Sequence, residues 1–112
     1  MKYSKPRKIY YCQQCNIPTQ TLHEVCFGNS NRKIAIEYSI QVPVCNDCHK
    51  KAHGTDKRPE KGYKEKWQKT FLDWLGMDMY VTIRAFNNYR LRGYLEINKE
   101  ACEEKIRSLE ID

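Results

Sequence analysis

Residues 45–54 read CNDCHKKAHG, and residues 12–15 read CQQC. Each CxxC pair forms a short turn that can direct two sulfur atoms toward one point, so Cys12, Cys15, Cys45 and Cys48 together predict a tetrahedral thiolate site for a structural zinc ion. A disulfide framework is the alternative for six cysteines in a short chain, but a reducing compartment favours the metal. The remaining Cys26 and Cys102 have no partner at ligand spacing and are expected to be small buried hydrophobes.

A short helix is predicted directly after the second cysteine pair. Asn46 or Asp47 can cap its start and Gly54 can end it, which gives a helix over residues 46–53. His49 and His53 then share one helix face, and both imidazoles can approach a single ion. Two unrelated surface histidines are the alternative interpretation of this spacing.

Two short strands are predicted between the cysteine pairs. The apolar, β-prone run Thr21–Phe27 contains His23 and Glu24 and ends at Gly28, and residues 41–45 (QVPVC) read as a second strand. We expect a loop between them. The predicted order is therefore a CxxC pair, a strand bearing His-Glu, a loop, a strand, a CxxC pair and a helix bearing two histidines.

This order resembles that of the HNH, or His-Me finger, endonucleases, and residues 22–54 (LHEVCFGNSNRKIAIEYSIQVPVCNDCHKKAHG) are similar to small bacteriophage members of that family. The resemblance implies an α+β fold in which a zinc-stapled ββα-metal finger occupies residues 9–54. It also implies a metal-dependent DNA endonuclease that hydrolyses phosphodiester bonds, of phage origin, with DNA as its partner and a phage or host protein as a further one.

The resemblance also assigns catalytic roles to His23, Glu24, His49 and His53. His23 would hold a second divalent ion (Mg, Mn, Ni or Zn), and His49 and His53 would be further ligands or contacts to the scissile phosphate. Glu24, at the position of the family's histidine base, would take a proton from water. Because adjacent strand residues point to opposite faces, His23 could instead be the base and Glu24 a ligand. Glu24 departs from the family's histidine, and Ile40 stands where the family has an asparagine. The alternatives are a non-catalytic zinc protein that binds DNA or a protein through a degenerate site, and a purely structural zinc ribbon.

Helices are expected to make up the second half of the chain. We divide it into residues 1–59, the finger, and residues 60–112, a helical extension packed on it. Aromatic residues at helical spacing predict one helix that ends at Gly76, and core packing is favoured over base stacking for them. A second helix is expected over Met79–Tyr89, with Tyr80, Ile83 and Phe86 on one side. A third, capped by Asn98, is expected over Lys99–Leu109, with Cys102, Ile106 and Leu109 inward.

Charge and hydropathy restrict the function classes. The chain carries 20 Lys and Arg against 14 Asp and Glu, which gives a net charge of +6. A basic surface attracts a polyanion through counterion release, although a solubilising surface is the plainer alternative. Mean hydropathy is −0.84, and we see neither a signal-peptide core nor an apolar run of roughly 18 residues that could span a membrane. We therefore expect a cytoplasmic protein without membrane partners.

Overall fold

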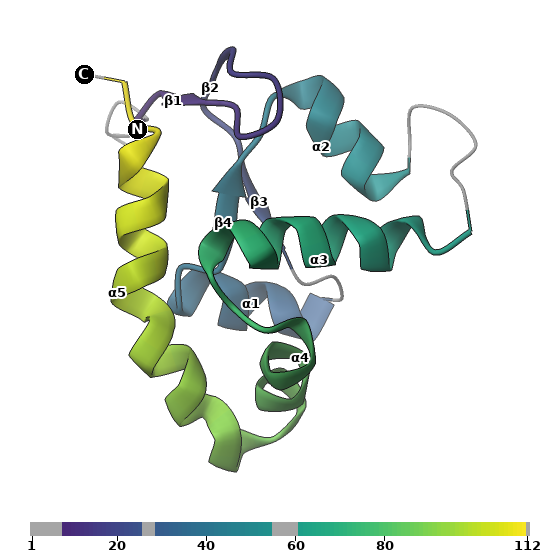
Figure 1. Cartoon of the computed structure of the whole chain (residues 1–112), viewed down its shortest axis with the longest axis vertical. Coiled ribbons are helices and arrows are strands. Elements are labelled where there is room, and N and C mark those ends of the chain that lie inside the picture. The colour runs from purple at the N-terminus through teal and green to yellow at the C-terminus, as the bar shows by residue number, and fades with distance from the viewer. Residues whose placement is uncertain (1–7, 26–28, 55–60, 112) are drawn as a thin grey trace, which may run out of the picture.

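The computed structural model of the protein describes residues 8–25, 29–54 and 61–111. It shows a mixed α+β fold with two small antiparallel sheets and several helices (Figure 1). In chain order the elements are β1 (Tyr10–Tyr11), β2 (Pro18–Thr19), β3 (Leu22–Glu24), α1 (Asn29–Glu37), β4 (Gln41–Pro43), α2 (Asn46–His53), α3 (Tyr63–Leu75), α4 (Met79–Asn87), the 3-10 helix η1 (Tyr89–Leu91) and α5 (Arg92–Ser108).

The first cysteine pair lies in the turn between β1 and β2, which pair antiparallel. Within this turn the Cys12 N–H donates to Ile17 O at 2.7 Å, and the Asn16 N–H donates to Cys12 O at 2.8 Å. Asn16 adopts φ +64°, a left-handed conformation that asparagine tolerates better than most residues. The Gln13 N–H also reaches Pro43 O at 2.9 Å. The turn is therefore held against the end of β4, close to the second cysteine pair.

β3 and β4 form the hairpin that leads into α2. They pair antiparallel in the register Leu22↔Pro43, His23↔Val42 and Glu24↔Gln41. The expectation of a loop between the two strands is wrong, because α1 (Asn29–Glu37) forms within that segment. Ala35 of α1 is fully buried and Ile34 packs partly against the core, so contact with the hairpin stabilises this short helix. Cys26 lies outside the described residues.

α2 covers residues 46–53, as predicted, but a different residue caps it. Cys45 is the N-cap, and its sulfur accepts a hydrogen bond from the Cys48 N–H, in place of the expected Asn46 or Asp47. The cap is thus made by a proposed metal ligand. Gly54 ends the helix at φ +69°, and its N–H donates to the carbonyls of Lys50 and Lys51, the left-handed termination for which glycine is favoured.

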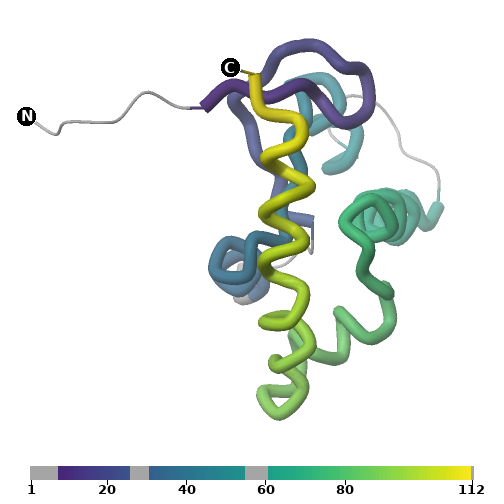
Figure 2. The backbone as a smooth tube through the Cα atoms, turned by 60° about the vertical axis from the view of Figure 1, so that its left-hand side comes forward, coloured from purple at the N-terminus to yellow at the C-terminus, as the bar shows by residue number. Residues whose placement is uncertain are grey.

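α3 (Tyr63–Leu75) packs against α2, α4 and α5. Phe71 and Leu75 are buried, and Trp67 and Trp74 lie partly buried against the core. This confirms core packing for these side chains. Figure 2 shows α5 between α1 on one side and α3 on the other in that view.

The two last helices differ from their predicted bounds. The helix expected over Met79–Tyr89 ends at Asn87 and is followed by η1. Tyr80, which was expected on the inner side, is 72% exposed, and Thr82 is buried instead. The helix expected over Lys99–Leu109 begins a full two turns earlier, at Arg92, so Asn98 lies inside it. Its side chain donates to Tyr94 O at 2.8 Å. Cys102 and Ile106 face inward as predicted.

The C-terminal segment returns to the first strand (Figure 1). Tyr10 pairs with Glu110, the Tyr11 N–H donates to Leu109 O at 2.7 Å, and the Ile111 N–H donates to Ile9 O at 2.7 Å. One hydrophobic core is shared by residues from both halves of the chain, from Cys12 through Val42 to Cys102. Among the described helices, none has both the length and the apolar character needed to cross a bilayer.

Candidate metal centres

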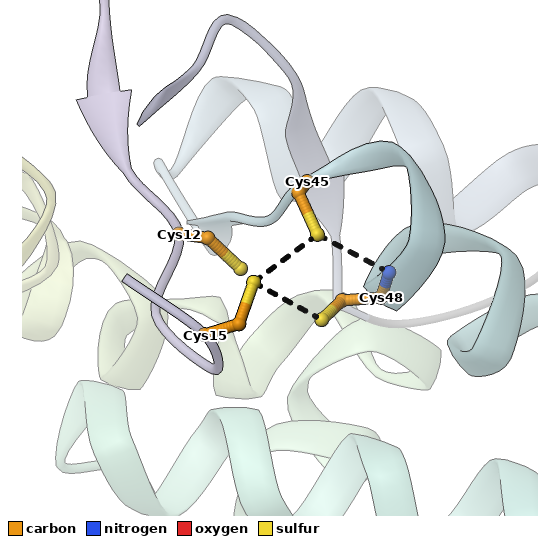
Figure 3. A group of neighbouring side chains, drawn as sticks. All are labelled: Cys12, Cys15, Cys45 and Cys48. Atoms are coloured by element: carbon orange, nitrogen blue, oxygen red, sulfur yellow. Dashed lines mark hydrogen bonds between the residues drawn. The ribbon is translucent and has the colours of Figure 1, made fainter. Parts of the chain in front are cut away.

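The two CxxC pairs bring four sulfur atoms into one cluster (Figure 3). The sulfurs of Cys15 and Cys45 are 3.4 Å apart, and those of Cys48 and Cys15 are 4.0 Å apart. A zinc ion bound tetrahedrally at about 2.3 Å from each sulfur separates neighbouring sulfurs by about 3.8 Å, which lies between these distances. Cys12, Cys45 and Cys48 are buried and Cys15 is exposed. The four cysteines lie close enough to hold a metal ion and are compatible with structural zinc.

The thiols of this cluster shift one another's pKa values. Burial raises the pKa of Cys12, but backbone N–H groups directed at its sulfur outweigh burial and lower that pKa to about 7. Burial and the neighbouring Cys45 sulfur raise the pKa of Cys48, and the sulfurs of Cys45 and Cys12 raise that of Cys15. Four thiolates are thus unfavourable without a cation between them. A bound dication removes this penalty, since a coordinating thiol is deprotonated outright.

A second cluster gathers the three histidines. His23, His49 and His53 each offer a ring nitrogen, and these nitrogens lie within 4.8 Å of one another. The Nε2 atoms of His49 and His53 are 3.0 Å apart, and the His23 ring centroid is 5.1 Å from each of theirs. Tetrahedral ligation at about 2.0–2.1 Å places neighbouring nitrogens about 3.3 Å apart. The three histidines thus form a second group whose nitrogens lie close enough that they could hold a metal ion.

The fold fixes these imidazoles from two sides. His23 is 6% exposed, pairs with Val42 across the hairpin and packs its ring on Phe71 of α3 at 5.4 Å between centroids. At the other end of the cluster the Tyr63 hydroxyl donates to His53 O at 3.2 Å. A Cβ at Gly54 would lie 2.7 Å from the Tyr63 ring. The start of α3 thus closes over the end of α2 that carries His53.

The surroundings of two of these imidazoles, His23 and His49, favour their neutral form. Burial, helped by His49 and His53, lowers the pKa of His23 to about 3. Burial and His53 also lower the pKa of His49, against an opposite effect of the Glu24 carboxylate. The buried Nδ1 of His23 has no hydrogen-bond partner among the described residues. A neutral His23 with an unpartnered buried nitrogen suits metal ligation, which requires deprotonated ligands.

Glu24 does not belong to the three-histidine cluster. Its Oε1 lies 3.0 Å from the Nε of Arg32 on α1, and its Oε2 accepts from the Gln41 side chain at 3.5 Å. The alternation of β3 explains this, since His23 faces the core and Glu24 does not. Ile40, at the position of the family's asparagine, is fully buried, and its backbone N–H donates to Ala35 O at 2.8 Å. The isoleucine side chain is apolar, so the position of the family's asparagine has no hydrogen-bonding side chain.

Sequence reasoning missed the residues that support the cluster. Phe71 and Tyr63 were expected only as core residues of a helix, and Arg32 was not singled out. Their roles depend on where α1 and α3 pack, which local spacing does not indicate. Comparison of the chain with protein-family models, with curated proteins and with solved structures found no match.

Proposed function

We propose that the protein is a metal-dependent DNA endonuclease of the HNH type, and that His23, His49 and His53 hold its catalytic divalent ion. The observation that carries the proposal is the convergence of one strand imidazole and two helix imidazoles beside a four-cysteine cluster. A strand pair followed by a helix, with ligands on the first strand and on the helix, is the arrangement that the resemblance implies. Four cysteines would hold a structural zinc ion at its base.

The chemistry suits phosphodiester hydrolysis. A divalent ion such as Mg²⁺, Mn²⁺, Ni²⁺ or Zn²⁺ would supply stabilisation of the charge on the attacked phosphate and on the leaving oxygen. His23 offers an imidazole that is neutral at neutral pH and can therefore hold a metal. A water oxygen attacks phosphorus while a base removes its proton, and the bond to the leaving oxygen breaks as that oxygen is protonated.

Charge favours DNA as the substrate. The net charge is +6, and exposed lysines lie on α2, at the start of α3 and just before it (Lys50, Lys51, Lys61, Lys64 and Lys66). These helices also border the three-histidine cluster. A duplex lying over this surface would release counterions and bring its phosphates close to the imidazoles.

Cleavage of supercoiled plasmid, with each of the four divalent ions supplied in turn, tests the proposal. Wild type should convert the plasmid to nicked or linear forms, and His53→Ala should not. His53 is exposed, so this substitution should leave folding, zinc content and DNA affinity nearly unchanged while removing transition-state stabilisation. His23→Ala should behave likewise if the fold tolerates it. Wild type that is inert with all four ions, or a His53→Ala variant as active as wild type, would refute the proposal.

Two observations favour a second candidate, a non-catalytic zinc protein that binds DNA or a protein partner. Glu24 is engaged by Arg32 and Gln41, and the buried Ile40 cannot orient a base. In that case wild type and His53→Ala would bind DNA or a partner protein equally well, and neither would cleave with any ion.

A further inference from the structure

Glu24 and Arg32 form an ion pair at the strand position that follows His23. Glu24 follows His23 directly in β3, so the two Cα atoms are about 3.8 Å apart. Arg32 reaches it from α1, with its Nε 3.0 Å from Glu24 Oε1. The guanidinium is thereby held beside the strand residue that follows His23.

The geometry of the pair leaves most of the guanidinium uncommitted. The side chain of Arg32 is 71% exposed and that of Glu24 is 20% exposed. Arginine carries five N–H donors, and the contact to Glu24 uses the Nε end. The side-chain exposure leaves much of the guanidinium open to solvent beyond this contact. A planar fork of N–H groups that faces solvent matches two oxygens of a phosphate.

We propose that Arg32 binds a phosphate of the DNA next to the three-histidine cluster, and that Glu24 is its positioning residue. Glu24 holds the Nε so that both Nη groups face outward, and Gln41 fixes the other carboxylate oxygen. The inference rests on the proposed function for the identity of the ligand as DNA. In this proposal Glu24 acts by positioning Arg32 and is not the general base.

Binding of the zinc-loaded full chain to duplex DNA, measured over a range of salt concentrations without an added second metal, tests the phosphate contact. Arg32→Ala should weaken affinity about tenfold and reduce the slope of log K against log salt by about 0.9, because one phosphate contact is lost. Lys33→Ala is the matched control, since it removes the same charge from an exposed neighbouring position on α1. It should leave affinity within about twofold.

Glu24→Gln shows whether Glu24 positions Arg32 or acts only through its own negative charge, because the two roles change DNA affinity in opposite directions. Removing an acidic charge by itself should tighten DNA binding. If Glu24 positions Arg32, the variant should instead bind more weakly than wild type. This loss should disappear when Glu24→Gln is introduced into Arg32→Ala, because a positioning residue has no effect once its partner is gone.

Several outcomes would overturn the phosphate site. One is an equal loss of DNA affinity in Arg32→Ala and Lys33→Ala, or no loss in Arg32→Ala. The others are tighter DNA binding by Glu24→Gln and a wild-type chain that does not bind DNA. The endonuclease proposal fails separately, through absence of cleavage. A protein that never cleaves but shows the Arg32-specific loss would retain the phosphate site and refute only the nuclease.

Discussion

Replacing Gly54 by alanine tests whether Tyr63 fixes the end of α2 that carries His53. At φ +69° an alanine costs about 1–2 kcal/mol in left-handed strain. Its Cβ would also lie 2.7 Å from the Tyr63 ring and hydroxyl, so the ring must leave its rotamer, at about 0.5–1.5 kcal/mol. Loss of the hydrogen bond to His53 O adds about 0.5–1.5 kcal/mol. The free energy of unfolding should therefore fall by about 2–5 kcal/mol.

Denaturant unfolding of the zinc-loaded chain measures this loss, and Gly76→Ala is the matched control. Gly76 also ends a helix, at φ +80°, but a Cβ there meets nothing within 4 Å. It should lose only the strain of about 1–2 kcal/mol. Adding Tyr63→Ala to Gly54→Ala should remove the clash and leave the strain alone. Equal losses at Gly54 and Gly76 would refute the argument that Tyr63 closes over α2.

Two further predictions concern the metal ligands and pH. Cys48→Ser should lower the zinc content by about one ion per chain in elemental analysis and remove the helical signal of α2 from the circular dichroism spectrum, whereas Cys102→Ser should keep the metal. Equal zinc in both variants would contradict the four-cysteine site. His23 has a pKa of about 3 in the folded state, below its unfolded value near 6.5, so the unfolded state binds more protons and stability should fall as pH decreases. When the pH falls from about 7.5 to 5, the free energy of unfolding of wild type without an added second metal should decrease by about 2 kcal/mol more than that of His23→Gln. The zinc content is checked at both pH values. Equal decreases in the two proteins would rule out a buried neutral His23.

The parts of the fold that could be predicted are those set by short spacings. Two CxxC pairs, the i and i+4 positions of His49 and His53, and a glycine at position 54 constrain the chain locally, and the structure brings the corresponding groups together. α1 was missed because only a narrow face of it, at Ile34 and Ala35, meets the core. Such a helix has weak apolar periodicity and is stabilised mainly by its tertiary contacts.

Other features depend on contacts between distant residues. The pairing of Tyr10 with Glu110 joins the two ends of the described chain, and nothing near Glu110 in the sequence indicates a strand. In α4 the core contains Thr82 while Tyr80 points to solvent, because apolar residues occur on more than one face of that helix. The Glu24–Arg32 pair likewise depends on where α1 lies against β3.

The proposed catalytic centre requires a second divalent ion held by His23, His49 and His53. Crystals grown with Ni²⁺ or Mn²⁺, with anomalous data collected at the absorption edges of zinc and of the added metal, would locate both ions. We predict one zinc peak among the sulfurs of Cys12, Cys15, Cys45 and Cys48, and a separate peak of the added metal within ligand distance of the three imidazoles. A single peak at the sulfurs, with the imidazoles hydrogen-bonded to one another or turned apart, would contradict a metal site at the three histidines.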